Sequence, residues 1–317
     1  MNILVAGANG MVGRSIIRLL SNDNESLIFK PSRNELDYLD QISVEKYFGR
    51  NKINQVYIAA AKVGGIYAND TFPATFIYEN IQIASNIINA AHKNDINKIL
   101  FLGSSCIYPK NAQQPISEDQ LFNGYLESTN EAYAISKIAG IKLCESYNRQ
   151  YGRDYRSIMP CNLYGPFDNF DEKESHVIPA LIRKFLLAKK NSSDHVKIWG
   201  SGRPRREFLH VDDLAKACKL IMNLDTSKYR EITSPMISHI NVGAGEDISI
   251  TELAQIIMKK MDYYPELVFD ESKPDGTFKK LLDISNIKKL GWKPNIPLED
   301  GILETISWAK NNITNLH

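Results

Sequence analysis

Apolar runs and helical repeats alternate along the first half of the chain. Short stretches predicted to be strands, led by the apolar run 3–6, occupy residues 3–6, 26–29, 55–60, 97–102 and 155–159. Between them, apolar residues recur at three- and four-residue steps, which predicts helices over 11–20, 43–48, 74–93 and 133–151. Strands that alternate with helices form βαβ units, whose parallel sheet is buried on both faces. We therefore expect an α/β fold with a doubly wound parallel sheet of Rossmann type.

The second half of the chain is less regular. Its pattern predicts helices over 177–190, 211–223 and 298–311, a strand over 196–199, a turn over 200–204 and a loop over 162–170. Asp212 or Asp213 is expected to cap the helix that begins at Val211. Because the sequence has no long flexible linker, we expect two interleaved domains. The larger covers 1–165 and takes in roughly 207–233, and 166–317 mainly form the smaller.

The composition narrows the class of protein. Of 317 residues, 43% are hydrophobic and 24% charged, which is typical of a soluble globular protein. The 38 Lys and Arg nearly balance the 37 Asp and Glu, and a net charge of +1 argues against a general nucleic-acid binder. No apolar run approaches the ~20 residues of a membrane-spanning helix, and no signal-peptide pattern is seen. Four cysteines without a CxxC pair, and histidines without metal spacing, predict a reduced, cytoplasmic, metal-free protein.

A glycine-rich segment follows the first predicted strand and opens the first predicted helix. It has the spacing GxxGxxG and consists of Gly7-Ala8-Asn9-Gly10-Met11-Val12-Gly13. Glycines let a backbone turn tightly and approach a pyrophosphate, and a helix N-terminus offers free N–H groups and the positive end of a dipole. The place of the segment between strand and helix favours dinucleotide binding over a purely structural turn.

The residues after the second predicted strand bear on the choice of cofactor. NAD-binding sites usually carry an acidic residue there, which holds the ribose 2′-hydroxyl. Here no acid is present, and Lys30 and Arg33 supply positive charge with Ser32 between them. Arg33 is expected to pair with a 2′-phosphate, which favours NADP over NAD; the alternative is a solvated surface arginine. Asp40 is a candidate contact for the adenine.

Tyr133 and Lys137 lie four residues apart in a predicted helix, so their side chains share a face. A neighbouring ammonium and a bound nicotinamide ribose favour the phenolate, so we expect the pKa of Tyr133 to shift down toward neutrality. Such a tyrosine donates a proton to a carbonyl oxygen while hydride arrives at the carbon. Ser104 and Ser105 end the fourth predicted strand, where open α/β sheets bind ligands. Each is a candidate donor to the same oxygen, or a hydroxyl of a turn or cap.

The glycine segment, the serine at the strand end and the Tyr133–Lys137 pair occur in the order found in short-chain dehydrogenases/reductases. Longer stretches of sequence make the likeness closer. Over nearly its whole length the chain resembles the GDP-L-fucose synthase family, in the extended nucleotide-sugar branch of that superfamily. The stretches that carry the resemblance are 59–66 (AAAKVGGI), 103–109 (GSSCIYP), 162–166 (NLYGP), 175–179 (SHVIP), 199–202 (WGSG) and 273–277 (KPDGT).

The resemblance implies an NADPH-dependent enzyme that epimerises GDP-4-keto-6-deoxy-D-mannose at C3 and C5 and reduces it at C4, giving GDP-L-fucose. Ser104, Tyr133 and Lys137 match the reducing residues. Cys106 and His176 match the epimerising pair, and these residue types suit the chemistry. A 4-keto group acidifies the hydrogens on both neighbouring carbons, so a thiolate takes one proton and a histidinium on the other face returns one. Without the resemblance, Cys106 would be an inert thiol and His176 a capping or core histidine.

The resemblance also places further residues around the two ligands. Besides the glycine segment, Arg33 and Asp40, the expected cofactor-binding residues are Leu102, Ser105, Tyr133, Lys137, Pro160, Asn162, Leu163 and His176. The expected substrate-binding residues are Lys62, Asn162, Lys184, Trp199, Arg206, Asp275 and Lys280. Two positions depart from the family pattern, since Asn9 and Lys184 stand where arginine is common. The first leaves NADP selection to Arg33, and the second keeps the charge without the two-pronged donor geometry.

Two other functions stay open. An enzyme with the same motifs can be a C4 reductase, with or without epimerase activity, of another GDP-4-keto sugar such as a GDP-4-keto-heptose. One further carbon at C6 changes the pocket only locally, so motifs around C3 to C5 do not distinguish the two. A catalytically retired NADP-binding protein is disfavoured by the intact serine, tyrosine, lysine, cysteine and histidine. The resemblance further implies a homodimer through the predicted helices 74–93 and 133–151.

Overall fold

A six-stranded parallel sheet forms the centre of the molecule. The computed structural model describes residues 1–22, 26–172, 174–273 and 275–313, so Pro274 of the KPDGT stretch lies outside the described residues. In spatial order the strands are β10 (His239–Val242), β5 (Asp154–Pro160), β4 (Lys98–Leu102), β3 (Gln55–Ile58), β1 (Asn2–Ala6) and β2 (Leu27–Phe29). The predicted α/β fold of Rossmann type is confirmed.

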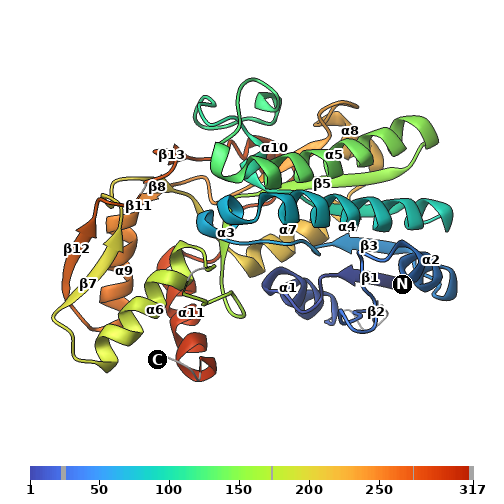
Figure 1. Cartoon of the computed structure of the whole chain (residues 1–317). Coiled ribbons are helices and arrows are strands. Elements are labelled where there is room, and N and C mark those ends of the chain that lie inside the picture. Colours follow the sequence, from blue (N-terminus) through green and yellow to red (C-terminus); the bar gives the residue numbers. More distant parts are fainter. Residues whose placement is uncertain (23–25, 173, 274, 314–317) are drawn as a thin grey trace.

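Helices cover both faces of this sheet (Figure 1). One face carries α2 (Gln41–Arg50), α4 (Pro73–Lys93) and α5 (Glu131–Tyr151), of which α4 and α5 pack side by side. The other face carries α1 (Met11–Leu20), packed against α7 (Val211–Asn223). Because the strands are covered on both sides, β1, β3 and β4 are nearly continuous apolar runs and not alternating ones.

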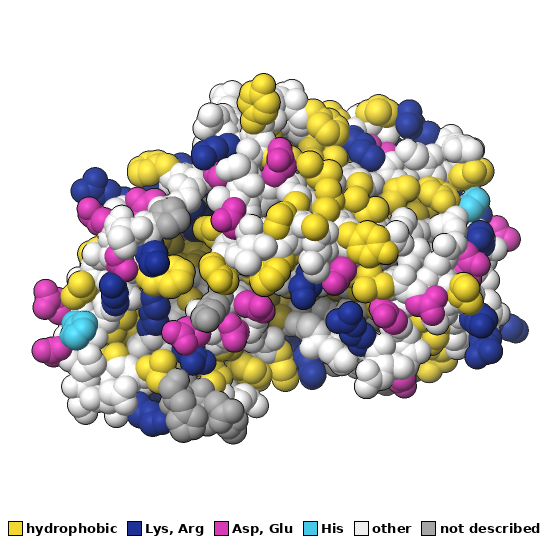
Figure 2. All heavy atoms as spheres, viewed as in Figure 1, with side chains coloured by type: hydrophobic (Ala, Val, Ile, Leu, Met, Phe, Trp, Pro, Cys, Tyr) yellow, Lys and Arg dark blue, Asp and Glu magenta, His cyan; other side chains and the backbone are white. Residues whose placement is uncertain are grey.

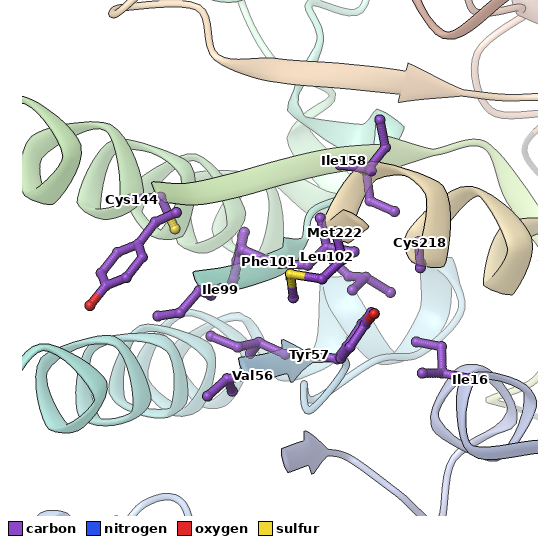
Figure 3. Packing of buried hydrophobic residues seen from close by; sticks show 14 of the residues in the cluster. Ile16, Val56, Tyr57, Ile99, Phe101, Leu102, Cys144, Ile158, Cys218 and Met222 are labelled. Atoms are coloured by element: carbon purple, nitrogen blue, oxygen red, sulfur yellow. The ribbon is translucent and has the colours of Figure 1, made fainter. Parts of the chain in front are cut away.

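The core between sheet and helices is apolar (Figure 3). Side chains from β3 and β4, among them Tyr57 and Leu102, lie near Met222 of α7. Three cysteines are buried in or beside this core: Cys144, Cys161 and Cys218. Burial raises the pKa of each, that of Cys144 to about 12, so these thiols stay protonated and serve as small apolar groups.

A second group of elements lies beside the large sheet, at the left of Figure 1. Its helices are α6 (Val177–Lys190), α9 (Ile250–Met261) and α11 (Leu298–Asn312). Two strand pairs are β12 (Glu266–Asp270) with β7 (His195–Trp199) and β6 (Asn162–Tyr164) with β9 (Phe208–His210). A three-stranded sheet joins β11 (Ile248–Ser249), β8 (Arg205–Arg206) and β13 (Lys279–Lys280). Buried residues of this group form a second hydrophobic core.

The chain passes between the two groups more than once. Phe208 of β9 belongs to the second core, whereas Leu209 and Leu214, only a few residues further, belong to the first. Short helices and 3-10 turns fill the connections: α3 (Ile66–Thr71), α8 (Thr226–Glu231), α10 (Ser285–Lys289), η1 (Ser105–Ile107), η2 (Glu118–Gln120) and η3 (Ser128–Asn130). Within the described ranges, no helix has the length and apolar content needed to cross a membrane.

Three local predictions were wrong. Residues 162–170 are not a loop throughout, since 162–164 form β6, which pairs in parallel with the distant β9. The third strand ends at Ile58 instead of Ala60. The cap of α7 is not an aspartate but His210, whose Nδ1 accepts a hydrogen bond from the backbone N–H of Asp212 (3.3 Å). Asp213 is buried in the first turn, where its carboxylate accepts two backbone N–H groups from the segment before α11.

Candidate active site

The glycine segment makes the turn from β1 into α1. Gly7 has φ +85°, a left-handed conformation that favours glycine, and a Cβ on Gly13 would collide with the Gly7 carbonyl oxygen. Gly10 is the N-cap of α1, and the first turn of the helix contains no acidic residue. The first N–H groups of α1 and the positive end of its dipole are therefore left for an anion. This cradle fits the pyrophosphate of a dinucleotide.

A hollow of about 380 Å³ borders the glycine segment and is lined by Ala8, Asn9, Arg14, Ile17, Arg18, Lys30 and Phe167. Arg14 is a residue that the motifs did not reveal. Its Nε donates to the carbonyl oxygen of Asn9 (2.9 Å), and its guanidinium lies 4.6 Å from the centre of the Phe167 ring. Arg33 is not among the lining residues, so positive charge comes to this hollow from Arg14 and Lys30, while Arg18 is paired with Asp212.

Asp40 is engaged in capping α2. Its carboxylate accepts hydrogen bonds from the backbone N–H groups of Ile42 (3.0 Å) and Ser43 (3.3 Å) and from the Ser43 hydroxyl (2.5 Å). The hydrogen bond with the Ser43 side chain is the main reason that the pKa of Asp40 is lowered. A contact between Asp40 and adenine stays a prediction.

The end of β4 and the first turns of α5 bring the predicted reducing residues together. Lys137 is buried, and its Nζ donates to the carbonyl oxygen of Leu102 (2.9 Å). The same ammonium lies 5.7 Å from the centre of the Tyr133 ring. Ser104 accepts the backbone N–H of Cys106 (3.2 Å) and forms a hydrogen bond with the Tyr133 phenol. A hydroxyl, a phenol and an ammonium therefore meet at one edge of the sheet.

Burial decides the protonation states in this group. Desolvation raises the pKa of Tyr133 well above its ordinary value, Cys106 adds to the rise, and the Ser104 hydrogen bond opposes it. The expected downward shift is therefore wrong for the chain without ligands, because desolvation outweighs the nearby cation. Desolvation also lowers the pKa of Lys137 to about 8. At neutral pH the phenol is protonated and Lys137 is charged, which are the states that a proton donor and its cationic neighbour need.

Cys106 and His176 come from different elements. Cys106 lies in η1 and is partly exposed, unlike the other three cysteines. His176 stands at the N-cap of α6, yet its ring makes no capping hydrogen bond. His176 as a whole residue is exposed, but surrounding protein desolvates the imidazole enough to lower its pKa. The carbonyl of Glu174 accepts the Gly65 N–H (3.0 Å), which ties the segment before His176 to the 59–66 stretch.

Two predicted substrate-binding residues lie next to each other on adjacent short strands. Arg206 of β8 and Lys280 of β13 are register partners in a parallel pair. Desolvation lowers the pKa of Arg206, while Cys106 and Asp275 act in the opposite direction. The guanidinium therefore interacts electrostatically with the thiol and keeps its charge. Such a pair of cations suits an anionic ligand.

Two ammonium groups lie near Trp199 at the end of β7. The indole is 53% exposed, and the Nζ atoms of Lys184 and Lys273 lie 5.0 and 5.6 Å from its ring centre. Asp275 accepts the backbone N–H (2.7 Å) and the hydroxyl (2.8 Å) of Ser201, which fixes the turn after Trp199. A hollow of about 540 Å³ beside this turn is lined by Ser201, Arg203, Glu271, Lys273, Asp275 and Phe278.

The remaining predicted residues have structural contacts of their own. The Lys62 backbone pairs with the Asn80 side chain through two hydrogen bonds (2.8 and 3.0 Å), while its own side chain is exposed. Asn162 donates to the carbonyl oxygen of Glu207 (2.9 Å). Three further residues lie around the ends of β4 and β5: Ser105, Pro160 and Leu163. Within the described ranges, no group of three or more His, Cys, Asp or Glu side chains could hold a metal ion.

The fold and this site define a dinucleotide-dependent enzyme of the short-chain dehydrogenase/reductase type. The glycine cradle lies at the first strand–helix turn, and the serine, tyrosine and lysine meet at the carboxyl end of a neighbouring part of the sheet, where such folds bind their ligands. Residues 3–243 match the NAD dependent epimerase/dehydratase family, and the chain belongs to that family.

Individual relatives sharpen this assignment. The chain is 57% identical to the GDP-L-fucose synthase of Escherichia coli (strain K12) over 310 residues, which cover 98% of the chain and 97% of the relative. Its structure is similar to that of a GDP-6-OMe-4-keto-L-xylo-heptose reductase from C. jejuni, with TM-score 0.91 and 36% identity over 98% and 97% of the two chains. A GDP-L-fucose synthetase from Naegleria fowleri bound to NADP matches with TM-score 0.88 and 27% identity over 100% and 95%. The resemblance to GDP-L-fucose synthases is confirmed.

Proposed function

We propose that the protein is an NADPH-dependent enzyme that converts GDP-4-keto-6-deoxy-D-mannose into GDP-L-fucose. The observation that carries this proposal is the meeting of Ser104, Tyr133 and Lys137 at the end of β4, next to the partly exposed Cys106. The high identity to the E. coli GDP-L-fucose synthase supports the choice of substrate. The reaction has two parts, epimerisation at C3 and C5 and reduction at C4.

NADP(H) is the proposed cofactor, and when bound it supplies the hydride for C4. The uncapped N-terminus of α1 holds the pyrophosphate, and Arg14, Lys30 and Arg33 are the candidates for the 2′-phosphate. Lys137 keeps an ammonium group beside Tyr133, where it holds the ribose of the nicotinamide half. The larger domain, 1–165 with roughly 207–233, binds this cofactor, and 166–317 mainly form the GDP-sugar domain.

The epimerisations need a base and an acid on opposite faces of the sugar. Cys106 as thiolate takes the proton from the carbon next to the keto group, and the C–H electron pair moves into an enolate whose charge falls on O4. Ser104 and the neutral Tyr133 phenol donate hydrogen bonds to that oxygen. His176 returns a proton from the other face, which inverts the configuration. Once the thiol has released its proton to solvent and the imidazole has taken one up, the same two groups serve at the second carbon.

Tyr133 and Lys137 also take part in the reduction of C4. Once the configuration is set, hydride adds to C4 and Tyr133 gives its proton to O4, so the carbonyl becomes a hydroxyl. The raised pKa of Tyr133 keeps this proton in place until the oxygen develops negative charge. Lys137 stabilises the phenolate that remains.

The GDP half of the substrate fits the second group of elements. Arg206 and Lys280 neutralise the diphosphate, and Trp199 offers an exposed indole face for the guanosine beside Lys184. Asp275 keeps the 200–202 turn in place and lines the adjoining hollow. Lys62 and Asn162 are the candidates for the sugar hydroxyls.

A product analysis tests the proposal. GDP-4-keto-6-deoxy-D-mannose and its GDP-4-keto-heptose counterpart are each incubated with NADPH and with NADH, and the products are identified by NMR. We expect GDP-L-fucose from the first substrate and a preference for NADPH. Turnover of the heptose substrate alone would overturn the proposal in favour of a reductase of a GDP-4-keto-heptose, the class of enzyme named for the C. jejuni structure.

A homodimer is the proposed assembly, and its interface is the outer surface of α4 and α5. Figure 2 shows hydrophobic side chains gathered over these helices. Tyr78 of α4 is 63% exposed, and Ile135 and Tyr151 of α5 are 40% and 50% exposed. Large apolar groups gathered on one face favour contact with another protein surface, here a second copy of the chain.

The working thiol of Cys106 suits the reducing cytoplasm.

A further inference from the structure

Asn130 occupies a capping position without capping. It is the N-cap residue of α5, the helix that carries Tyr133 and Lys137, yet its side chain makes no hydrogen bond to the helix. Asparagine is among the residues most strongly preferred at N-caps because its side-chain oxygen accepts a backbone N–H there. At this position the usual structural reason for an asparagine is therefore missing.

The side chain of Asn130 contacts the Cys106 sulfur instead. Its Nδ2 donates to the Sγ of Cys106 (3.6 Å), across 24 residues of sequence. Its Oδ1 is buried and has no hydrogen-bond partner among the described residues. Buried polar atoms in proteins nearly always have a hydrogen-bond partner, so an exception needs an explanation. The amide therefore leaves its oxygen unpaired while its nitrogen donates to the thiol.

Positive charge faces the same sulfur from more than one element. Cys106 lies at the N-terminal end of α5, where the helix dipole is positive. Two titratable groups interact electrostatically with the thiol, Tyr133 of the same helix and Arg206 of β8. The phenol is neutral at physiological pH, because burial raises the pKa of Tyr133, and the guanidinium is charged. A helix N-terminus and a nearby cation are the surroundings in which protein thiols ionise.

We propose that Asn130 is a positioning residue for epimerisation, which holds the Cys106 sulfur as a thiolate by donating its amide N–H to it. The inference rests on the proposed function, since it assigns Asn130 to the base of that reaction. The thiolate takes a proton from carbon and becomes a thiol, and it returns to thiolate when that proton passes to solvent. The amide N–H group stabilises the charged form at the start of each cycle and orients the sulfur lone pair.

Alkylation of Cys106 by iodoacetamide tests the contact without any substrate. Cys106 is the cysteine with partial exposure and the other three are buried, so the slow reagent reports on one site. We expect Asn130→Asp and Asn130→Ser to raise the pH of half-maximal alkylation by about one unit, which corresponds to a roughly tenfold lower rate near neutrality. Both replacements are good N-caps, so the helix is preserved. Asn94→Asp, at the carboxyl end of α4, carries the same charge change and should leave the profile unchanged.

Solvent exchange gives the second readout. In deuterated water both Asn130 variants should incorporate deuterium at C3 and C5 about tenfold more slowly than the parent, with NADPH binding retained as the check on folding. An unchanged alkylation profile in both variants, or a change in Asn130→Asp alone, would overturn the inference, because the second result signals only charge repulsion. Failure of the parent enzyme to exchange deuterium at all would refute the proposed function instead, and the alkylation profiles would still decide the role of Asn130.

Discussion

Burial gives Tyr133 and Lys137 complementary protonation states. The raised pKa of Tyr133 keeps its phenol neutral, and a pKa of about 8 leaves Lys137 charged at neutral pH. A proton donor must begin protonated, so the chain already holds the tyrosine in the form that reduction uses. The desolvation of Lys137 is the cost of keeping a cation at this place.

Removal of the Tyr133 hydroxyl should separate chemistry from structure. In Tyr133→Phe the ring keeps its edge contact with Phe76 (6.3 Å between centres), so folding and NADPH binding should persist. We expect NADPH oxidation with the GDP-4-keto sugar to fall by about 10²–10⁴-fold, the range for loss of a general acid. A variant that oxidises NADPH at the parent rate would show that another group supplies the proton.

Lys137 should make stability depend on pH. Burial lowers its pKa from 10.5 to about 8. Below pH 8 the folded and unfolded chains both hold the proton, so the burial cost is present in full. Between pH 8 and 10.5 only the unfolded chain holds it, so this residue's contribution to the free energy of unfolding rises with pH. In denaturant unfolding, we compare the free energy of unfolding of Lys137→Met with that of the parent. The stability advantage of the variant should be about 2–3 kcal/mol smaller at pH 10 than at pH 7. A constant gap would contradict the burial of a charged ammonium.

Residues whose roles follow from local motifs could be predicted, and residues defined by distant contacts could not. The YxxxK spacing alone places Tyr133 and Lys137 on one helix face. Arg14 meets Phe167, and Asn130 meets Cys106, only because the fold brings separate segments together. An N-cap asparagine looks structural in a sequence until its side chain is seen to point elsewhere.

At the scale of elements, short pairings were the hardest to predict. The alternation of strand-like and helical segments located β1 to β5 of the large sheet, and burial on both faces explains the apolar runs of β1, β3 and β4. β6 was missed because its Gly-, Pro- and Asn-rich surroundings favour a loop locally, while its partner β9 lies far along the chain. Tertiary pairing overrode local preference there.

The turn from β1 into α1 provides a matched pair of substitutions. A Cβ at Gly13 would collide with the carbonyl oxygen of Gly7, whereas a Cβ at Gly10 would meet nothing nearer than 3.6 Å. Thermal and denaturant unfolding should show Gly13→Ala destabilised by roughly 1–3 kcal/mol, with weaker NADPH binding. Gly10→Ala should stay within about 0.5 kcal/mol of the parent. Equal effects of the two would mean that the segment is not packed as described.

At the scale of the whole molecule, two cores share one chain. The large sheet supplies the reducing residues and Cys106, and the second group of elements supplies Arg206, Lys280 and Trp199. Because segments such as β9 and α7 connect the cores directly, the two groups are held together by short covalent links. The sequence predicted this interleaving from the absence of a linker, and the domain boundaries themselves stay a prediction.

The proposed dimer makes a prediction at this scale. Tyr78→Glu and Ile135→Glu each place a charge on the outer surface of α4 and α5 and should shift the protein from dimer toward monomer. Leu303→Glu, at a residue of α11 that is 45% exposed, is the control and should leave the assembly intact. Sedimentation velocity distinguishes the two species. If all three variants sediment like the parent, the interface lies elsewhere.

The central claim is that one site both epimerises and reduces a GDP-4-keto sugar. The most direct measurement is incubation of the enzyme with GDP-4-keto-6-deoxy-D-mannose and NADPH in deuterated water, followed by NMR of the product. The account predicts GDP-L-fucose carrying solvent deuterium at C3 and C5, with the hydrogen at C4 delivered from NADPH. A product reduced at C4 with no solvent deuterium at C3 or C5 would contradict it.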